Sequence, residues 1–468
     1  IECQDKVALK LLSQIKIAFE DSRLPYRVDV VDMKAVKPYF KELIKDEMVV
    51  FPLNHFSKVP VLRFPEFSGE WEIKKLGELL EEKLANGEMI SKDDFVDCNG
   101  NFHLIQLDDL YKSNINLVSD ALQIIDVNKS LKVVKVGDII INRVSIKPEG
   151  VGKVIAIKDL PIKLSTTFES NMFRVRLSEN RIDQIFFSFF ACTQNYLKQK
   201  LSLAKTTNQS SLSQGDISRI EVFYSSLSEQ QKIASFLTEV DNKIEQLTKK
   251  KQLLADYKKG VMQQIFSQEI RFKQDDGSDY PDWEVKKLGD IGEVKSGAGF
   301  PEIEQNGKDG TPFYKVSDMN LSLNTVEMLD ANNYVTDEQI ERMRYKVIFA
   351  PSIIFAKVGA AIFLERKRKA HNFLIDNNMM AFTPKSGDIN YLKYFFDKTR
   401  LSKFAQTGAL PSYNGSDLKT IQVTFPCLDE QIKTANFLSE IDTKINQVEK
   451  QLAGTKQFKS GLLQQMFV

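Results

Sequence analysis

The chain has few of the residues that build metal centres, disulfide frameworks and membrane spans. It holds four cysteines and three histidines in 468 residues, with no C-x-x-C and no H-x-x-x-H spacing. We therefore expect no zinc site, disulfide framework or cofactor, and a reducing, cytoplasmic location. The longest apolar run, around residues 185–191, is far too short to cross a bilayer, so we expect no membrane association.

An excess of charge of either sign is also absent. Lysine and arginine number 64 against 63 aspartates and glutamates, which excludes a uniformly basic protein. A local basic groove remains compatible with this balance, because a nucleic-acid partner responds to the distribution of charge rather than to its sum. With 22 glycines and 14 prolines the chain is not linker-dominated. Its length predicts two to four domains.

Two segments of the chain repeat. Residues 227–267 align without a gap with residues 428–468, which lie 201 positions further on. Upstream, WEIKKLG at 71–77 recurs as WEVKKLG at 283–289, 212 positions further on. Both pairs occur in the same order, so the chain consists of two halves, each opened by the short motif and closed by the long segment.

The long closing segments have a heptad pattern. Apolar residues recur in alternating steps of three and four from Leu237 to Ile265 and from Leu438 to Met466. This spacing predicts two long helices, each with a coiled-coil seam. Neither seam can be buried alone, so we predict that the two helices pack against each other. Polar breaks in the seams at Lys251, Lys258, Thr455 and Lys459 would help to set their register.

The globular part of each half has the pattern of a mixed α/β fold. In the first half we expect strands within 133–144, 152–157 and 171–177 and a helix over 182–203. In the second half we expect strands within 347–358, 359–364 and 378–382 and a helix over 389–404. Residues 216–222 and 417–423 predict a last strand in each half.

Polar loops lie at matching places in the two halves, and basic side chains lie near them. Amide and hydroxyl groups can hydrogen-bond base edges, and cations can contact phosphates. For any single residue a merely solvated role is the stronger interpretation, and the basic run 365–369 could be an exposed hairpin; the duplicated placement favours the loops as a set. The candidate DNA contacts are Asn142, Arg143, Lys147, Lys153, Thr206, Thr207, Asn208, Gln209, Ser210, Lys357, Arg366, Lys367, Arg368, Gln406, Thr407, Ser412, Tyr413 and Asn414.

Residues 55–468 resemble the specificity (S) subunit of a type I restriction–modification system. The resemblance rests on LRFPEF at 62–67 with the motif at 71–77, on LSEQQKIA at 227–234, and on QQIF at 263–266. It implies an α+β fold with a pseudo-two-fold internal repeat, in which two mixed α/β target recognition domains are separated by two long antiparallel coiled-coil helices.

The same resemblance implies a function. Each target recognition domain would read half of a split site in double-stranded DNA, and the helices would fix the gap between the halves. The helices would also dock two methyltransferase (M) subunits, and restriction (R) subunits would join the assembly. Methylation and cleavage would belong to those partners, so the chain itself would not be an enzyme. We expect an N-terminal appendage at 1–54, target recognition domains at 55–226 and 271–426, and spacer helices at 227–270 and 427–468.

Residues 1–54 fall outside this resemblance and are similar to the tail of a minimal nucleotidyltransferase domain. Asp29 would be the candidate metal-binding carboxylate, but the upstream Gly-Ser and Asp-x-Asp elements are missing, so we favour an inactive remnant. The start at Ile1 fits a truncated fusion. Two alternatives stay open: a nucleotidyltransferase-related enzyme with a coiled-coil docking arm, and a coiled-coil interaction protein that never touches DNA.

Overall fold

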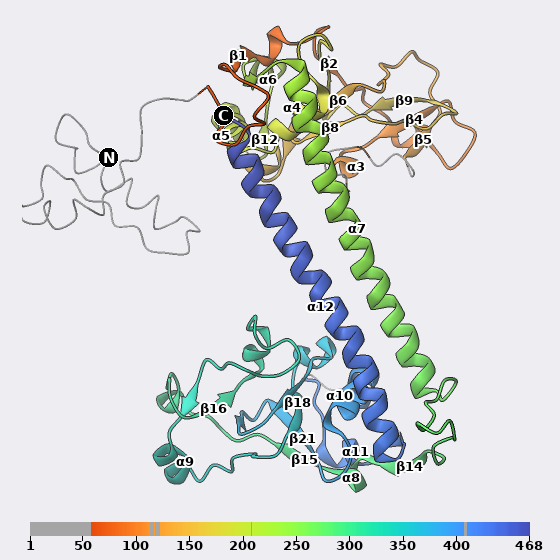
Figure 1. Cartoon of the computed structure of the whole chain (residues 1–468), viewed down its shortest axis with the longest axis vertical. Coiled ribbons are helices and arrows are strands. Elements are labelled where there is room, and N and C mark those ends of the chain that lie inside the picture. Colours follow the sequence, from red (N-terminus) through yellow and green to blue (C-terminus); the bar gives the residue numbers. More distant parts are fainter. Residues whose placement is uncertain (1–57, 113–116, 118–121, 207, 407–409) are drawn as a thin grey trace, which may run out of the picture. The chain divides into compact units, whose positions relative to one another are not determined.

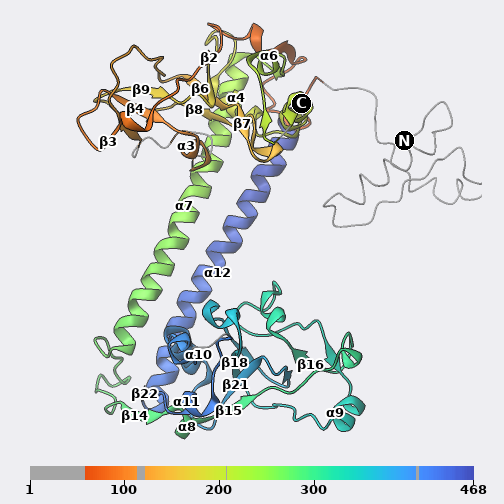
Figure 2. The ribbon, with the colours of Figure 1, turned by 180° about the vertical axis from the view of Figure 1, so that it is seen from behind.

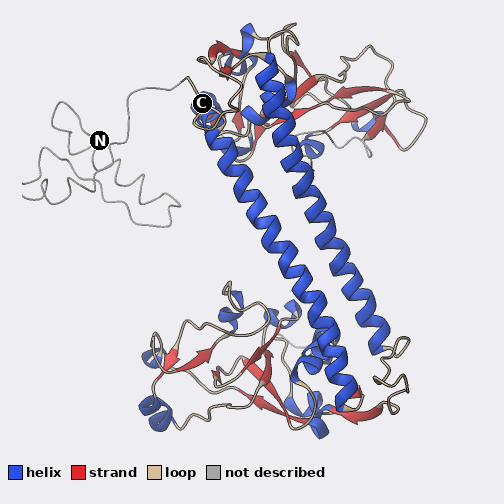
Figure 3. Ribbon diagram, viewed as in Figure 1, coloured by secondary structure: helices blue, strands red, loops and turns tan. Residues whose placement is uncertain are grey.

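The computed structural model describes residues 58–112, 117, 122–206, 208–406 and 410–468. By its internal contacts the chain forms two units. Unit 1 comprises residues up to Val240 together with Phe458–Val468, and unit 2 comprises Asp241–Gln457. Each unit mixes helices and strands (Figure 3). The appendage predicted at 1–54, with Asp29, lies outside the described residues, and the predicted domain boundaries stay predictions.

The described part of unit 1 contains two four-stranded sheets, a short strand pair, and a small three-stranded sheet that is described with the candidate site. The first sheet has the order β2 (Ala85–Asn86), β10 (Met172–Arg176), β6 (Asp138–Asn142), β8 (Val154–Ala156). The second has the order β3 (Phe95–Val96), β5 (Gln123–Ile125), β4 (Phe102–Ile105), β9 (Ser165–Phe168). Strand β1 (Glu72–Lys75) pairs with β13 (Glu221–Tyr224). The helices are α3 (Leu107–Lys112), α4 (Gln184–Phe190), α5 (Gln194–Leu203), α6 (Gln214–Ser218) and the start of α7 (Leu227–Phe266).

Unit 2 has the corresponding parts. Its four-stranded sheet has the order β15 (Gly292–Ser296), β21 (Met379–Pro384), β18 (Ser352–Ala356), β19 (Lys367–Ala370). A smaller sheet has the order β17 (Tyr334–Val335), β16 (Thr311–Tyr314), β20 (Leu374–Ile375), and β14 (Glu284–Lys287) pairs with β22 (Gln422–Phe425). The helices are α8 (Leu288–Ile291), α9 (Asp337–Met343), α10 (Ile389–Lys398), α11 (Gly415–Lys419), the part of α7 from Asp241 on, and most of α12 (Leu428–Gln465).

The central strands of unit 2 are largely apolar, and both faces of the sheet are covered. Along β18, Ile353 and Phe355 enter the core cluster that also contains Leu438 of α12, whereas Ile354 enters a separate cluster with Tyr314. Successive side chains of a strand point to opposite faces, so the continuous apolar run fills two cores. In two opposite views α10 lies on the α12 side of this sheet and β16 on the other side (Figures 1 and 2).

The two long helices pair antiparallel within unit 2. The Nζ atom of Lys258 on α7 lies 2.6 and 2.8 Å from the two carboxylate oxygens of Asp442 on α12. Seven residues earlier on α7, Lys251 lies 2.6 Å from Glu449, which is seven residues later on α12. Opposite directions of travel define an antiparallel pair. The predicted polar breaks at Lys251 and Lys258 are therefore ion-paired across the seam.

The sequence repeat is also a structural repeat. In unit 1, Glu72 of β1 pairs with Tyr224 of β13, and in unit 2 Glu284 of β14 pairs with Phe425 of β22, at the register that the repeat offsets require. In each unit a buried glutamate in the first turn of a long helix accepts hydrogen bonds from an arginine that lies earlier in the chain, before the repeated W-E-x-K-K-L-G motif. Glu229 accepts from Arg63 and Glu430 from Arg271.

Three predictions about local structure are wrong. Residues 359–364 form a 3-10 turn, η6 (Ala360–Leu364), entered through Gly359 at φ 81°, and the strand is instead β19 in the basic run. Residues 216–218 belong to α6, whose start is capped by Ser213, so the last strand of unit 1 begins only at Glu221. In unit 2, α11 likewise extends to residue 419, and the last strand begins at residue 422. The helix expected over 182–203 is divided into α4 and α5, because Thr193 caps a new start. The helix expected over 389–404 likewise ends at Lys398 in α10, and residues 401–404 form a separate 3-10 turn. No helix in the described part of the chain has the length and apolar character needed to cross a bilayer.

Candidate nucleic-acid interface

Two of the predicted site segments in unit 1 lie side by side. Strands β11 (Lys205–Thr206), β12 (Ser210–Ser211) and β7 (Val144–Ser145) form a three-stranded sheet in that order. Ser211 pairs with Val144, and Ser210 pairs with Ser145. The amide-rich loop that follows α5 is therefore attached to the turn that joins β6 to β8, which we call the unit 1 turn (residues 143–153).

Unit 2 repeats this arrangement. Ser412, which lies 201 positions after Ser211, forms bridges with Val358 and with Gln406. The Gly359 N–H donates to the Pro411 carbonyl at 2.8 Å, and the Tyr413 N–H donates to the Lys357 carbonyl at 3.0 Å. The polar loop after α10 is thus attached to the connection between β18 and β19, which we call the unit 2 turn (residues 357–366).

The buried side chain of Asn142 fixes the unit 1 turn through hydrogen bonds to its backbone. Its side-chain amide donates to the carbonyls of Val144 at 3.1 Å and Gly150 at 2.9 Å, and its oxygen accepts the Lys153 N–H at 2.6 Å. The side chain is 0% exposed. A polar group buried in this way is satisfied inside the chain. The geometry therefore favours a structural role for Asn142 over the DNA contact that we predicted.

Two further buried side chains fix the same turn. The Tyr196 hydroxyl donates to the Gly152 carbonyl at 2.9 Å, and the Lys200 ammonium donates to the Glu149 carbonyl at 2.9 Å. Burial lowers the pKa of Lys200. Ser210, another predicted contact, is also fully buried. The turn is consequently a rigid feature of the surface.

The unit 1 turn borders a groove of about 510 Å³. Its lining includes two predicted residues, Lys147 and Gln209, together with Tyr111 of α3 and Ile146. The Lys153 Nζ atom lies 5.7 Å from the centre of the Tyr111 ring, and burial lowers the pKa of Lys153. Tyr111 was not predicted, because it lies in a distant segment of sequence with no polar loop to mark it.

Arg143 lies at the base of the unit 1 turn. Its guanidinium carbon lies 5.6 Å from the centre of the Phe173 ring. Its Nε atom is buried and has no hydrogen-bond partner among the described residues. Because that nitrogen is enclosed, it is not itself a contact for a DNA phosphate, and the contact predicted for this half-buried residue stays a prediction.

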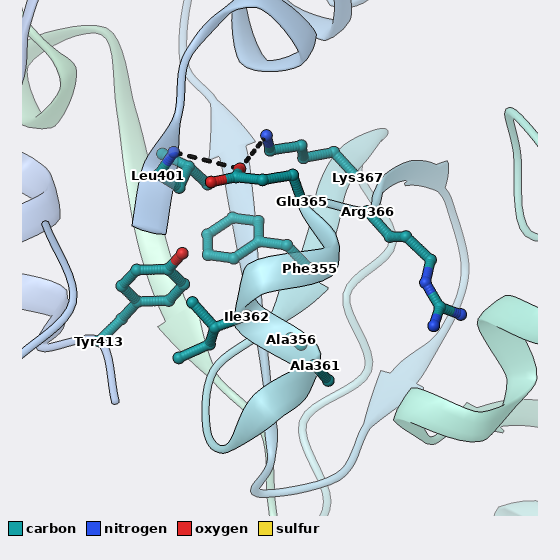
Figure 4. A pocket seen from close by; sticks show the side chains of 9 residues that line it. All are labelled: Phe355, Ala356, Ala361, Ile362, Glu365, Arg366, Lys367, Leu401 and Tyr413. Carbon is teal, nitrogen blue, oxygen red and sulfur yellow. Dashed lines mark hydrogen bonds and ion pairs between the residues drawn. The ribbon is translucent and has the colours of Figure 1, made fainter. Parts of the chain in front are cut away.

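The unit 2 turn is fixed by an apolar anchor, Ile362, and a half-buried carboxylate, Glu365. Ile362 enters the core with Phe355 and Tyr413. The Glu365 carboxylate accepts the N–H groups of Leu401 at 3.2 Å and Ser402 at 2.9 Å, at the start of η7 (Leu401–Phe404), and pairs with Lys367 (Figure 4). Burial alone would raise the pKa of Glu365, but the hydrogen bonds from Lys367 and Ser402 outweigh it and lower the pKa.

The basic run is not an exposed hairpin, because it forms strand β19 beside β18. Lys367 is 2% exposed and donates to the Thr399 carbonyl at 3.0 Å. Arg366 donates to Asn320, and Arg368 donates to the Asn324 carbonyl at 2.6 Å. Burial lowers the pKa of Arg368. These contacts favour a structural role for Lys367 in particular.

The remaining predicted residues divide by exposure. Tyr413 is buried and packs on Phe355 with ring centres 6.0 Å apart, which again favours a structural role. Gln406 donates to Asp417 at 3.1 Å, and Asn414 caps α11 by accepting the Ser416 N–H at 3.1 Å. Lys147, Asn208, Gln209, Gln406 and Asn414 are exposed, and Lys357 and Ser412 are half-buried. Thr206 lies in β11, and Thr207 and Thr407 lie outside the described residues.

Comparison with known proteins gives consistent matches over both halves. Residues 68–255 and 280–453 each match the model of a family described as "Type I restriction modification DNA specificity domain". The MjaX type I restriction enzyme specificity subunit of Methanocaldococcus jannaschii is 25% identical over 415 residues, covering 84% of this chain and 91% of that protein. The MjaVIII specificity subunit of the same organism is 28% identical over 246 residues, covering 47% of this chain and 54% of that protein.

Solved structures share the fold. The S subunit of a type I restriction–modification system from M. genitalium has a TM-score of 0.51 at 16% identity, covering 88% of this chain and 99% of that one. A chain from a structure of type I system assembly and conformational transition has a TM-score of 0.52 at 16% identity, with 85% and 97% coverage. At this identity the likeness concerns the fold.

Proposed function

Because the chain belongs to the type I restriction modification DNA specificity domain family, we propose that it is the subunit that selects the DNA sequence for a type I restriction–modification complex. Specificity subunits of this kind are non-catalytic. In this proposal residues 55–226 and 271–426 each read one half of a two-part site in double-stranded DNA. The chain also docks two methyltransferase subunits and the restriction subunits, in the cytoplasm where the DNA lies.

One observation carries the proposal. Each unit attaches an amide-rich loop to a rigid turn at the end of a central strand, through Val144 and Ser211 in unit 1 and through Val358 and Ser412 in unit 2. A side chain that discriminates between bases must be held in position, and a rigid turn provides this. Because the same arrangement occurs in both units, it favours a chain in which each unit reads one half-site of the same DNA duplex.

The charge of the chain supports weak binding on its own and tighter binding in the complex. The net charge is +1, and the basic groups that remain exposed at the two turns are few. Phosphate contacts release counterions, so their number sets how steeply affinity falls with salt. We expect a shallow salt dependence for this chain alone and a steeper one for the assembled methyltransferase complex. Binding by the complex that does not change with salt would favour the coiled-coil protein that never touches DNA.

The helices α7 and α12 give the proposal its second part. The chain passes from unit 1 to unit 2 within α7 and returns within α12. The ion pairs of Lys251 and Lys258 fix how α7 is aligned along α12. We propose that this alignment determines the number of unread base pairs between the half-sites.

Exchange of one reader tests the proposal. Residues 281–425 are replaced by the corresponding segment of another specificity subunit, and the sequences methylated by the complex are mapped. One half-site should change and the other should stay as in the parent complex, which serves as the internal control. A change in both halves, or in neither, would contradict two separate readers.

A further inference from the structure

Both turns display apolar side chains to solvent on a rigid support. In the unit 1 turn Ile146 is 82% exposed. In the unit 2 turn Phe363 and Leu364 are 61% and 56% exposed. Single exposed apolar residues are common on protein surfaces. Here they lie in corresponding connections of the two units. Ile146 lies between β6 and β8, and Phe363 and Leu364 lie between β18 and β19, which have the matching places in their sheet.

The support beneath these side chains prevents them from turning inward. In unit 2, Ile362 takes the core position and Glu365 fastens the end of the turn to η7, so Phe363 and Leu364 between them must face out. In unit 1, Asn142 and Ser210 tie down both sides of Ile146. An apolar side chain fixed in water gains free energy when a partner covers it.

The surroundings fit DNA, the partner of the proposed function. Ile146 lines the same groove as Lys147 and Gln209, and Leu410 beside Gly359 leads into the polar loop of unit 2. Cations and amides around an apolar tip match a base-pair edge flanked by phosphates. The methyl group of thymine is the apolar group that base edges present in the major groove.

We propose, on the basis of the function proposed above, that Ile146 and the Phe363–Leu364 pair are specificity-determining residues that contact a thymine methyl group. Ile146 makes this contact in the half-site of unit 1, and Phe363 with Leu364 makes it in the half-site of unit 2. Each half-site therefore contains an A·T pair that is read through its methyl group. The buried polar residues beneath the turns act as positioning residues for these contacts.

Uracil substitution gives the sharpest test, because uracil pairs as thymine does but lacks the methyl group. Binding of the assembled methyltransferase complex is measured with duplexes in which single thymines of each half-site are replaced by deoxyuridine. One replacement per half-site should weaken binding about fivefold, as expected for one methyl group against an apolar surface. With Ile146→Ala the uracil effect should disappear in one half-site, and with Phe363→Ala plus Leu364→Ala in the other.

Matched controls separate contact from general loss. Ile162 in unit 1 is 100% exposed, and Phe349 at the opposite end of β18 from the unit 2 turn is 73% exposed. Ile162→Ala and Phe349→Ala should leave every uracil effect unchanged. Circular dichroism and co-purification with the methyltransferase subunit show that each variant is folded and assembled.

The outcomes distinguish this inference from the function on which it rests. If the parent complex binds all sequences alike, the proposed function is wrong. If the parent complex is selective but uracil has no effect in either half-site, or the effect persists in the alanine variants, the methyl contact is wrong. If the turn variants lose the methyltransferase subunit while the controls keep it, the apolar tips bind protein and the inference is overturned.

Discussion

The arginine–glutamate pairs at the starts of α7 and α12 give a quantitative prediction. Glu229 and Glu430 are each 1% exposed, and Arg63 and Arg271 bind them in a forked manner, through Nε and Nη2. Removing one partner of a buried pair costs about 3–5 kcal/mol of unfolding free energy, because the other charge is left buried. In unit 2, Glu430 keeps a hydrogen bond from the Trp283 ring nitrogen at 2.9 Å. Arg63→Ala should therefore cost about 3–4 kcal/mol and Arg271→Ala about 2–3 kcal/mol.

The two tryptophans make this measurable unit by unit, because Trp71 lies in unit 1 and Trp283 in unit 2. Urea unfolding of Arg63→Ala is followed by fluorescence in a Trp283→Phe background, and that of Arg271→Ala in a Trp71→Phe background. Lys232→Ala is the control, since its pair with Glu66 is about half exposed on both sides and should cost less than about 0.5 kcal/mol. A cost below about 1 kcal/mol for Arg63→Ala, or a larger cost for Arg271→Ala than for Arg63→Ala, would refute the reasoning.

Three other predictions concern Asn142, Glu365 and the ion pairs between α7 and α12. Asn142→Ala should lower the free energy of unfolding by about 2–4 kcal/mol, because its three hydrogen bonds to the backbone of the turn are lost together with a longer one to the Tyr111 hydroxyl. Amide hydrogen exchange should rise across residues 143–153, and unchanged exchange there would count against a structural role for Asn142. Glu365 has a lowered pKa, so its stabilisation is present above its ordinary value of 4.5 and is lost as the pH falls through the folded value. Glu365→Gln should lose about 1–2 kcal/mol at pH 7, and its difference from the parent should shrink as the pH falls below 4.5. A loss that stays the same at all these pH values would be contrary evidence. Seven residues are inserted between Lys251 and Lys258, and seven more between Asp442 and Glu449, so that both ion pairs are kept and each helix is longer by about 10 Å. The mapped DNA sites should then have a gap longer by about three base pairs. An unchanged gap would exclude a spacing role for the helices.

The elements that could be predicted from the sequence are those that depend on local periodicity. The heptads from Leu237 and from Leu438 determine the long helices, and the repeated motif at 71–77 and 283–289 locates the paired strands β1 and β14. Local signals failed where tertiary contacts decide. Residues 359–364 have strand-like composition, but Gly359 and the burial of Ile362 make them a turn.

The candidate site was harder to predict because polar residues at strand ends can face either way. Asn142 and Lys367 carry groups suited to DNA, yet both are enclosed and bonded to backbone carbonyls within their own unit. The partners of Asn142 lie in the turn that follows it, and Lys367 reaches the Thr399 carbonyl after α10. Sequence alone does not show that these turns fold back onto the two side chains. Tyr111 was missed for the opposite reason: it reaches the groove from α3, far from the loops that marked the site.

The most direct test of the account is a genome-wide map of the methylated bases in a host that carries this chain with its methyltransferase subunit, compared with a host from which the gene for this chain is deleted. The account predicts one sequence made of two short specified blocks separated by a fixed number of unspecified positions, absent in the deletion host. A single continuous block, a variable gap, or the same methylation without this chain would contradict two readers held at a set spacing.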